Sequence, residues 1–206
     1  MDLTSRLQAL TGWAVIGVDA LISFKKFFSL LANRVFPIAI FIRRREDLDY
    51  LKDPDVFHEV YGHCSWLADP NFAEFNYRLG KLGVTLSQQQ RVYLARLYWF
   101  TVEFGVLQTA DGVKALGAGI VSSFEELRYS VESVVPRRLN FDLVEIMRTP
   151  YRYDELQRTY FILPSIDFLL SLSERDIVAA IDKAMHLGMH LSQHGIVLDD
   201  NDTRSC

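Results

Sequence analysis

The sequence predicts a mainly helical fold with a few short β-strands. Apolar residues recur at helical spacing in several segments, capping residues precede those segments, and β-branched runs are brief. The chain has 206 residues, of which 50% are hydrophobic, so it can bury a core of its own. We therefore expect a single domain over residues 1–198 and a disordered acidic tail at 199–206.

The expected elements follow from local start signals. Ser87 and Ser123 suit helix caps, with Glu126 completing a capping box, and Pro54 suits the first turn of a helix that starts near Asp53. Strands are expected at 15–18 and 113–116, and helices at 24–33, 70–82, 88–107, 123–132 and 174–191.

Composition argues against several classes of partner. The formal net charge of −4 disfavours nucleic-acid binding through counterion release. No apolar stretch approaches the roughly 20 residues of a membrane helix, and the N-terminus lacks the features of a signal peptide. Two cysteines, Cys64 and Cys206, do not form a disulfide framework. We expect a cytoplasmic protein whose partner is a small molecule, without nucleic acid or membrane.

Two histidines form the first candidate metal-binding pattern. His58 and His63 lie in a segment that resembles the zinc-protease pattern H-E-x-x-H but is one residue longer. On an ideal α-helix, a five-residue spacing separates the two rings by about 140°, which disfavours the protease interpretation. Gly62 could relax the backbone there. Metal ligands and two surface histidines both remain open at this point.

Glu103 strengthens the case for a metal. It lies in a stretch that is apolar on nearly every side, so its carboxylate is expected to be buried and to need a cation, hydrogen bonds or a proton. Arg96, two helical turns earlier, is a weaker candidate partner. Two histidines and one carboxylate match the facial triad of non-haem iron oxygenases, with a zinc site of the same ligands as the alternative.

Several motifs in order resemble the pterin-dependent aromatic amino acid hydroxylases, most of all their compact bacterial members that act on phenylalanine. The main motifs are His58-Glu59-x-x-Gly62-His63 and the segments 95–105 and 117–123. Shorter matches are Thr11-Gly12-Trp13 and the segments 31–34, 42–44, 48–50 and 158–161. The resemblance covers about 11–170 and implies the catalytic-domain fold of that family.

The resemblance assigns roles to individual residues. It implies that His58, His63 and Glu103 are the iron ligands and catalytic centre. Arg43 would bind the substrate carboxylate, because a guanidinium binds a carboxylate bidentately, whereas Arg44 and Arg45 are expected to be solvated. The other implied substrate-pocket residues are Tyr50, Asp55, Trp99, Ser122 and Ser123. The implied pterin-binding residues are Leu21, Ile22, Phe27 and Glu59, and the residues expected to support the ligands are Tyr98, Gly119 and Ser122.

The activity implied by this resemblance is an oxidation. An Fe(II)-dependent monooxygenase would use tetrahydropterin and O₂ to hydroxylate an aromatic amino acid, with phenylalanine to tyrosine as the leading expectation. The alternatives are a tryptophan hydroxylase of the same family, a two-His-one-Glu zinc hydrolase, and a truncated relative that binds iron without catalysis.

The sequence also departs from the family pattern. The family continues Gly-His with x-Pro-Leu-Leu, whereas this chain has Cys64-Ser65-Trp66, and Trp66 is expected to reshape the pocket wall. Ala20 replaces a glycine of the pterin loop.

The chain starts late relative to the family, without its N-terminal helices. We expect this to leave apolar side chains of the segment 27–31 exposed, among them Phe27, Phe28, Leu30 and Leu31. Because exposed apolar surface favours association, we expect the protein to self-associate weakly or to remain a monomer.

A histidine stripe is expected on the last helix. His186, His190 and His194 are spaced four residues apart, and we expect a solvated or packed face, with a second metal site as the less favoured alternative.

Overall fold

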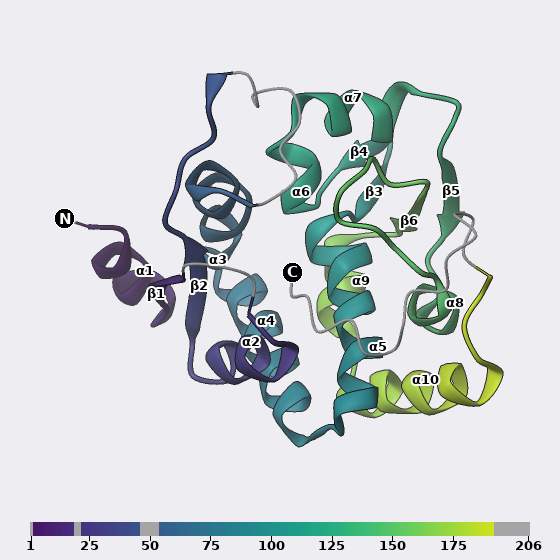
Figure 1. Ribbon diagram of the computed structural model, residues 1–206, viewed down its shortest axis with the longest axis horizontal. Coiled ribbons are helices and arrows are strands. Elements are labelled where there is room, and N and C mark those ends of the chain that lie inside the picture. The colour runs from purple at the N-terminus through teal and green to yellow at the C-terminus, as the bar shows by residue number, and fades with distance from the viewer. Residues whose placement is uncertain (1, 19–21, 46–53, 192–206) are drawn as a thin grey trace.

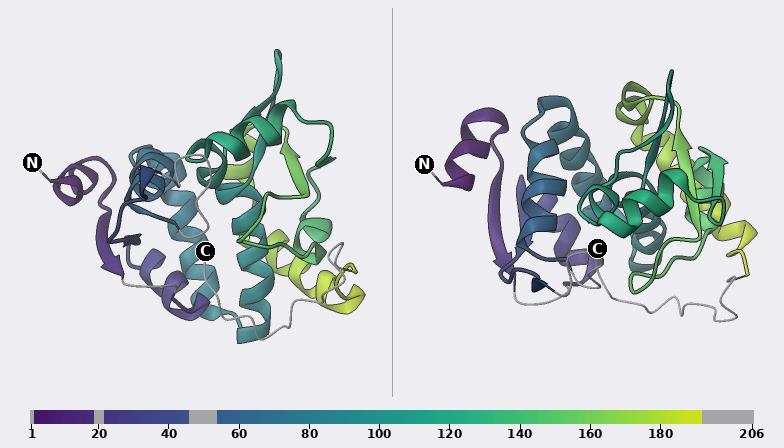
Figure 2. Two further views of the ribbon diagram at one scale, coloured as in Figure 1. Left: turned by 45° about the horizontal axis from the view of Figure 1, so that its top comes forward. Right: turned by 90° about the horizontal axis from the view of Figure 1, so that it is seen from above.

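The computed structural model describes residues 2–18, 22–45 and 54–191. Its centre is α5 (Gln88–Tyr98). This helix contacts α2 (Phe24–Leu31) on one side, and α8 (Leu143–Arg148) and α10 (Glu174–Leu187) on the other. In Figure 1 the elements up to α4 (Pro70–Thr85) lie to the left of α5, and β5 (Arg137–Asn140), α8 and α10 lie to its right. The two further views show the same division (Figure 2).

The N-terminal side combines two helices with a parallel strand pair. The helix α1 (Leu3–Thr11) precedes β1 (Ala14–Val18), and α2 (Phe24–Leu31) precedes β2 (Val35–Ala39), which pairs with β1 in parallel. Ser23 caps α2 by accepting a hydrogen bond from the backbone N–H of Lys26. The strand expected at 15–18 and the helix expected from residue 24 are therefore present.

The apolar face of α2 is covered, contrary to expectation. Phe27, Phe28 and Leu31 are all buried, and only Leu30 of this group keeps partial exposure. They pack against α4 (Pro70–Thr85), where Gly83 lets the Phe28 ring approach its backbone closely. The expectation of an exposed apolar layer at this helix is wrong.

Two π-helical segments interrupt the helical part of the chain. The segment η2 (His58–Cys64) leads into α3 (Ser65–Leu67), and η3 (Trp99–Glu103) follows α5 directly. Asp69 and Pro70 start α4, and Ser87 and Gln90 form a reciprocal capping box at α5. The helix expected over 88–107 thus ends early, because a strand begins at Val106.

A four-stranded sheet lies beyond η3, in the order β4-β3-β6-β5. The hairpin β3 (Val106–Thr109) and β4 (Gly112–Ala115) is antiparallel, whereas β6 (Thr159–Leu163) pairs in parallel with both β3 and β5 (Arg137–Asn140). The helices α6 (Ala118–Val121) and α7 (Phe124–Glu132) follow β4. The sequence predicted β4 and α7 but not β3, β5, β6 or α6.

The last helices close the core around α5. They are α8 (Leu143–Arg148), α9 (Ile166–Ser171) and α10 (Glu174–Leu187), each with a side-chain cap at its start. The expected end of the last helix at 191 is wrong, because Gly188 adopts φ 73° and terminates α10 at Leu187. The tail 199–206 lies outside the described residues. Within the described ranges, no helix is long and apolar enough to cross a membrane.

Candidate metal centre

The π-helical turn η2 resolves the histidine spacing. A π-helix forms hydrogen bonds between residues five apart, so residues at that spacing lie one above the other. His58 and His63 begin and nearly end η2, and their rings meet edge to face with centroids 4.9 Å apart. The expectation that this spacing opposes pairing of the rings is therefore wrong for this backbone.

Gly62 brings η2 against α6. A Cβ atom at Gly62 would lie 2.7 Å from Cβ of Ala118 and 3.0 Å from its Cα. Only a residue without a side chain fits at this approach. The contact holds Ser122, the residue that follows α6, next to the first histidine.

Glu103 completes the cluster from the second π-helical segment. Its Oε1 lies 2.9 Å from Nε2 of His63, and its Oε2 lies 3.6 Å from Nε2 of His58. The two Nε2 atoms are 3.1 Å apart, and one ligand atom of each residue lies within 4.8 Å of the others. His63 and Glu103 are 4% and 5% exposed, so the expected burial of this carboxylate is met.

Ser122 determines which nitrogen of His58 carries its proton. The Ser122 hydroxyl donates to the carbonyl oxygen of Ala118 at 2.7 Å and lies 2.8 Å from Nδ1 of His58. Because a hydroxyl has one proton to donate, it accepts from Nδ1–H. The Nε2 lone pair of His58 is then directed toward His63 and Glu103, as metal coordination requires.

Burial and mutual attraction set the charges at this cluster. Burial lowers the pKa of His58 to about 4, which keeps the imidazole neutral. Burial alone would raise the pKa of Glu103, but the attraction and hydrogen bond of His63 hold it below its usual value. The pKa of His63 is raised, because the attraction of Glu103 outweighs burial.

These three side chains fit a divalent metal ion. Two ligand atoms bound at right angles at about 2.1 Å from one ion lie about 3.0 Å apart, close to two of the three observed separations, 2.9 and 3.1 Å, and the third is 3.6 Å. The neutral imidazole of His58 and the ionised carboxylate of Glu103 are in the protonation states that metals bind, and the raised pKa of His63 means that this imidazole releases a proton when it binds a metal. The donor set of two nitrogens and one carboxylate leaves coordination positions for other ligands.

Arg43 and Asp55 form a buried pair beside the cluster. The Arg43 Nε and Nη2 groups donate to the two oxygens of Asp55 at 3.0 and 2.8 Å, and Nη1 donates to the carbonyl oxygen of Ser122 at 2.7 Å. Asp55 also accepts from the backbone N–H of His58 at 2.9 Å, so it anchors the start of η2. Arg44 and Arg45 are exposed, as expected.

Trp99 lies in a set of aromatic rings behind the cluster. Its indole stacks on Tyr151 with centroids 4.1 Å apart, and packs on Phe104 at 4.6 Å. The indole Nε1 donates to Oε1 of Gln157 at 3.0 Å. Neither Tyr151 nor Gln157 was predicted from the sequence, since the loop that carries them has no helical or strand periodicity.

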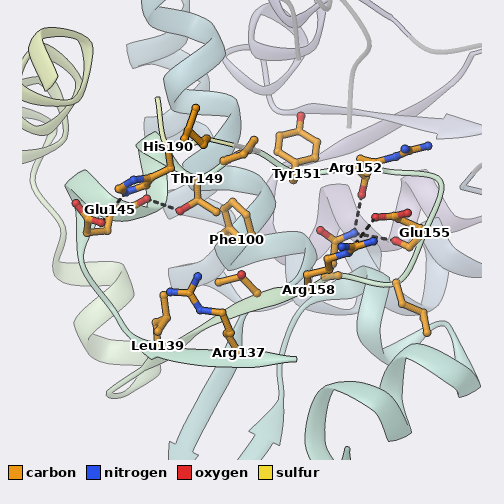
Figure 3. A pocket seen from close by; sticks show the side chains of 15 residues that line it. Phe100, Arg137, Leu139, Glu145, Thr149, Tyr151, Arg152, Glu155, Arg158 and His190 are labelled. Atoms are coloured by element: carbon orange, nitrogen blue, oxygen red, sulfur yellow. Dashed lines mark hydrogen bonds and ion pairs between the residues drawn. The ribbon is translucent and has the colours of Figure 1, made fainter. Parts of the chain in front are cut away.

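Tyr151 and Gln157 also line a cavity of about 430 Å³. Figure 3 shows Tyr151 at this cavity, with Arg152, Glu155 and Arg158 gathered at one end and the Glu145–His190 pair at the other. The cavity therefore shares a wall with the aromatic cluster around Trp99.

The residues assigned to the pterin have varied surroundings. Phe27 is 2% exposed and meets Phe36 and Tyr98 edge to face, so it belongs to the core next to the histidines. Glu59 is buried, and burial raises its pKa to about 8. Ile22 is partly buried against the core. Leu21, Ala20 and the substrate-pocket residue Tyr50 lie outside the described residues.

Tyr98 and Gly119, which were expected to support the ligands, and the expected substrate-pocket residue Ser123 each have a defined contact. The Tyr98 hydroxyl donates to Oδ1 of Asn76 at 3.1 Å within the core. A Cβ at Gly119 would lie 2.5 Å from the Phe104 ring, so this glycine permits close packing. Ser123 caps α7 by accepting from the backbone N–H of Glu126.

Trp66 stacks on Phe72 of α4 with centroids 5.0 Å apart and packs against the core, and its effect on the wall beside His63 stays a prediction.

The expectation of a histidine stripe on the last helix is wrong. His186 and His190 do not form a helical stripe, because α10 ends between them. His190 instead pairs with Glu145 at 2.7 Å, and His194 lies outside the described residues.

The fold and the cluster together define a class: a mainly helical protein that presents two histidines and one glutamate on π-helical turns as a metal centre. Residues 1–198 match the model of the biopterin-dependent aromatic amino acid hydroxylases. The chain belongs to this family.

Individual relatives agree with that assignment. The chain is 51% identical to the phenylalanine-4-hydroxylase of Vibrio cholerae, with 91% of this chain and 65% of the relative covered. It is 52% identical to that of Pseudomonas aeruginosa, with 92% and 72% covered. The chain therefore spans about two thirds of the length of these curated relatives.

Solved structures confirm the fold. The apo phenylalanine hydroxylase of Colwellia psychrerythraea superposes with a TM-score of 0.85 at 41% identity, covering 93% of this chain and 75% of that one. The Chromobacterium violaceum enzyme with bound iron(III) and 7,8-dihydrobiopterin gives a TM-score of 0.82 at 39% identity, covering 96% and 70%. The expectation of a mainly helical hydroxylase-like catalytic domain is confirmed.

Proposed function

We propose that this chain is an Fe(II)- and tetrahydropterin-dependent monooxygenase that hydroxylates phenylalanine to tyrosine. The observation that carries the proposal is the buried cluster of His58, His63 and Glu103, whose ligand atoms converge within 4.8 Å in a member of the biopterin-dependent hydroxylase family. Bound Fe(II), with tetrahydropterin and O₂, supplies the oxidising chemistry, and the protein supplies binding and orientation.

The metal would be held by Nε2 of both histidines and by the Glu103 carboxylate. The Ser122 hydroxyl keeps the proton of His58 on Nδ1, which leaves Nε2 free to coordinate. The contact of Gly62 with Ala118 fixes the distance between η2, which carries both histidines, and α6, which Ser122 follows.

The substrate carboxylate would bind Arg43. Its side chain makes three hydrogen bonds to protein oxygens, and a guanidinium has five N–H groups, so two remain for a carboxylate. Asp55 holds the guanidinium in place before the substrate arrives, which limits the entropy lost on binding. Trp99 would form the wall beside the substrate ring, with Tyr50, Ser122 and Ser123 completing the pocket.

The pterin would bind on the side of Phe27 and Glu59, with Leu21 and Ile22 in the adjoining loop. A flat polar bicycle needs an aromatic contact and hydrogen-bond partners at its edge. Phe27 supplies an aromatic side chain next to Phe36 and Tyr98, and Glu59 directly follows the first histidine.

We further propose a cytoplasmic monomer, or a weakly self-associating protein, with one catalytic domain over 1–198. The larger of two buried hydrophobic clusters includes residues from Leu7 to Ala184, which supports one domain. The buried free thiol of Cys64 supports a reducing compartment.

The test is product formation under defined loading. The protein is loaded anaerobically with Fe(II), mixed with phenylalanine and tetrahydropterin, and exposed to O₂, and the product is identified by mass. We expect tyrosine. Hydroxylation of tryptophan in preference would identify the other substrate class, hydrolysis that needs zinc would identify a hydrolase, and iron binding without product would identify a non-catalytic relative.

A further inference from the structure

The indole of Trp99 has one hydrogen-bond partner that neither the metal nor the pterin explains. Its Nε1 donates to Oε1 of Gln157 at 3.0 Å, and the two residues are only 5% and 4% exposed. Water cannot easily replace the partner of a buried N–H, so the position of Gln157 bears directly on the position of the indole.

The Gln157 amide has only one workable orientation. Its Nε2 donates to the carbonyl oxygens of Arg152 at 2.6 Å and Glu155 at 3.1 Å, while its Oε1 accepts from Trp99. A flipped amide would set NH₂ against the indole N–H and an oxygen against both carbonyls. Gln157 therefore presents its Oε1 acceptor to Trp99 and its Nε2 donors to the loop carbonyls.

The loop that carries Gln157 is anchored on its far side. The backbone N–H of Gln157 donates to Oε1 of Glu126 on α7 at 3.1 Å, and the buried Tyr160 hydroxyl donates to the same oxygen. Figure 3 shows neighbouring loop residues Tyr151, Arg152 and Glu155 around the cavity that this loop lines. The acceptor for Trp99 is thus fixed to α7 and β6 as well as to its own loop.

The same loop contributes the ring that faces Trp99. Tyr151 stacks on the indole at an interplanar angle of 17°, and Phe104 packs against it at 34°. Stacking restrains the plane of the indole but allows it to slide and rotate within that plane. A hydrogen bond at Nε1 removes that remaining freedom. Trp99 also begins η3, the π-helical segment that ends at Glu103.

We propose that Gln157 is a positioning residue that fixes the indole of Trp99 and thereby orients the aromatic ring of the substrate. This inference rests on the proposed function, in which Trp99 forms the wall beside that ring. Gln157 acts through Trp99, since its polar groups are committed to the indole and the loop. A misplaced wall should weaken substrate binding and let pterin oxidation proceed without ring hydroxylation.

The first measurement needs no turnover. The three tryptophan indole N–H resonances are recorded by NMR in ¹⁵N-labelled protein, and Trp99→Phe identifies the one from Trp99. In Gln157→Met, a variant of similar length without an acceptor amide, the Trp99 resonance should move and its hydrogen exchange should accelerate. The resonances of Trp13 and Trp66 should stay in place. An unmoved Trp99 resonance would overturn the proposal.

The second measurement follows the reaction. In Gln157→Met the phenylalanine KM should rise about tenfold, as expected for loss of a buried hydrogen bond, and tyrosine formed per pterin oxidised should fall. The exposed Gln108 on β3 supplies the matched control, and Gln108→Leu should change neither value. Thermal melting and bound iron are measured in every variant to separate positioning from unfolding.

A double-mutant cycle isolates the pair. In a Trp99→Phe background, which lacks the indole donor, Gln157→Met should change KM by less than twofold. An equal effect in both backgrounds would show that Gln157 acts elsewhere and overturn the proposal. If the unmodified protein forms no tyrosine, the proposed function fails and the substrate role of Gln157 fails with it, while the NMR result still decides whether Gln157 holds Trp99.

Discussion

Nδ1 of His58 lies 2.8 Å from Oγ of Ser122, and the serine hydroxyl is already committed as a donor to the carbonyl oxygen of Ala118. The serine therefore accepts the imidazole proton and directs the Nε2 lone pair toward His63 and Glu103. The carbonyl oxygen of Ser122 at the same time accepts from Nη1 of Arg43. One residue at the end of α6 thus contacts both the candidate metal ligand and the candidate carboxylate receptor.

Removing the Ser122 hydroxyl should weaken metal binding without unfolding the protein. In Ser122→Ala, His58 loses the partner that fixes its tautomer, and such losses cost about 10- to 100-fold in metal affinity. Iron affinity is measured by competition with a chelator. The exposed Ser171, which also donates to a backbone carbonyl, supplies the control Ser171→Ala. Equal affinities in both variants would contradict the role given to Ser122.

A methyl group at Gly62 should disturb the same centre from the other side. Gly62→Ala would place Cβ 2.7 Å from Cβ of Ala118, so α6 has to move away from η2 and take Ser122 with it. We expect iron affinity to fall about tenfold or more, as for other losses of supporting contacts. Gly112→Ala strains the β3–β4 turn at φ 102° but meets no atoms, and should lower stability while sparing iron affinity. A Gly62→Ala protein with normal iron affinity would show that the close approach is dispensable.

Arg43 should contribute strongly to the affinity for the substrate carboxylate. Arg43→Ala should raise the phenylalanine KM roughly tenfold or more, because a bidentate carboxylate contact is lost. That variant also leaves Asp55 buried without its partner, so Arg43→Lys, which keeps the charge but loses the planar fork, is the sharper test. Arg44→Ala and Arg45→Ala change exposed residues and should leave KM within about twofold. If all three positions behave alike, the carboxylate binds elsewhere.

Glu126 should make stability depend on pH. Burial raises its pKa from 4.5 to about 7, and its Oε2 has no hydrogen-bond partner among the described residues. Between these pH values the folded protein keeps a proton that the unfolded chain has lost, so the free energy of unfolding falls as pH rises. Glu126→Gln cannot ionise and still accepts from Tyr160 and Gln157.

The stability advantage of Glu126→Gln over the unmodified protein should therefore grow from pH 5 to pH 8, by about 3 kcal/mol at most. Urea denaturation at several pH values measures it. Glu125→Gln, at the exposed neighbouring position, should show no such trend. A constant difference for Glu126→Gln across this range would mean that its carboxyl titrates normally.

Local sequence patterns predicted where several helices begin, because a capping side chain bonds to the backbone N–H only three residues further along the chain. Ser87 and Ser123 do start helices where their sequence context indicates. The π-helical geometry at His58 and His63 could not be predicted this way, since no capping residue marks the start of η2, and the close approach of Gly62 to Ala118 joins segments far apart in sequence. Likewise Gly188 ends α10 through a positive φ, which separates two histidines that share a helical spacing in sequence.

The site could be predicted only in part, because some of its residues are brought together by contacts between distant segments. His58, His63 and Glu103 stand in recognisable motifs, whereas the partners that orient neighbouring side chains come from distant segments. Gln157 reaches Trp99 across 58 residues of chain, and no periodicity marks it. Family resemblance identified the residues that would contact metal and substrate, and tertiary contacts alone reveal those that hold them.

The most direct test of the metal centre is iron stoichiometry in matched variants. After anaerobic loading and gel filtration, the unmodified protein should retain one Fe(II) per chain, and His58→Ala, His63→Ala and Glu103→Ala should each retain little iron and form no tyrosine. Glu74→Ala, which changes an exposed glutamate on α4, should bind iron normally. Full iron occupancy in Glu103→Ala would contradict the assignment of His58, His63 and Glu103 as the metal ligands.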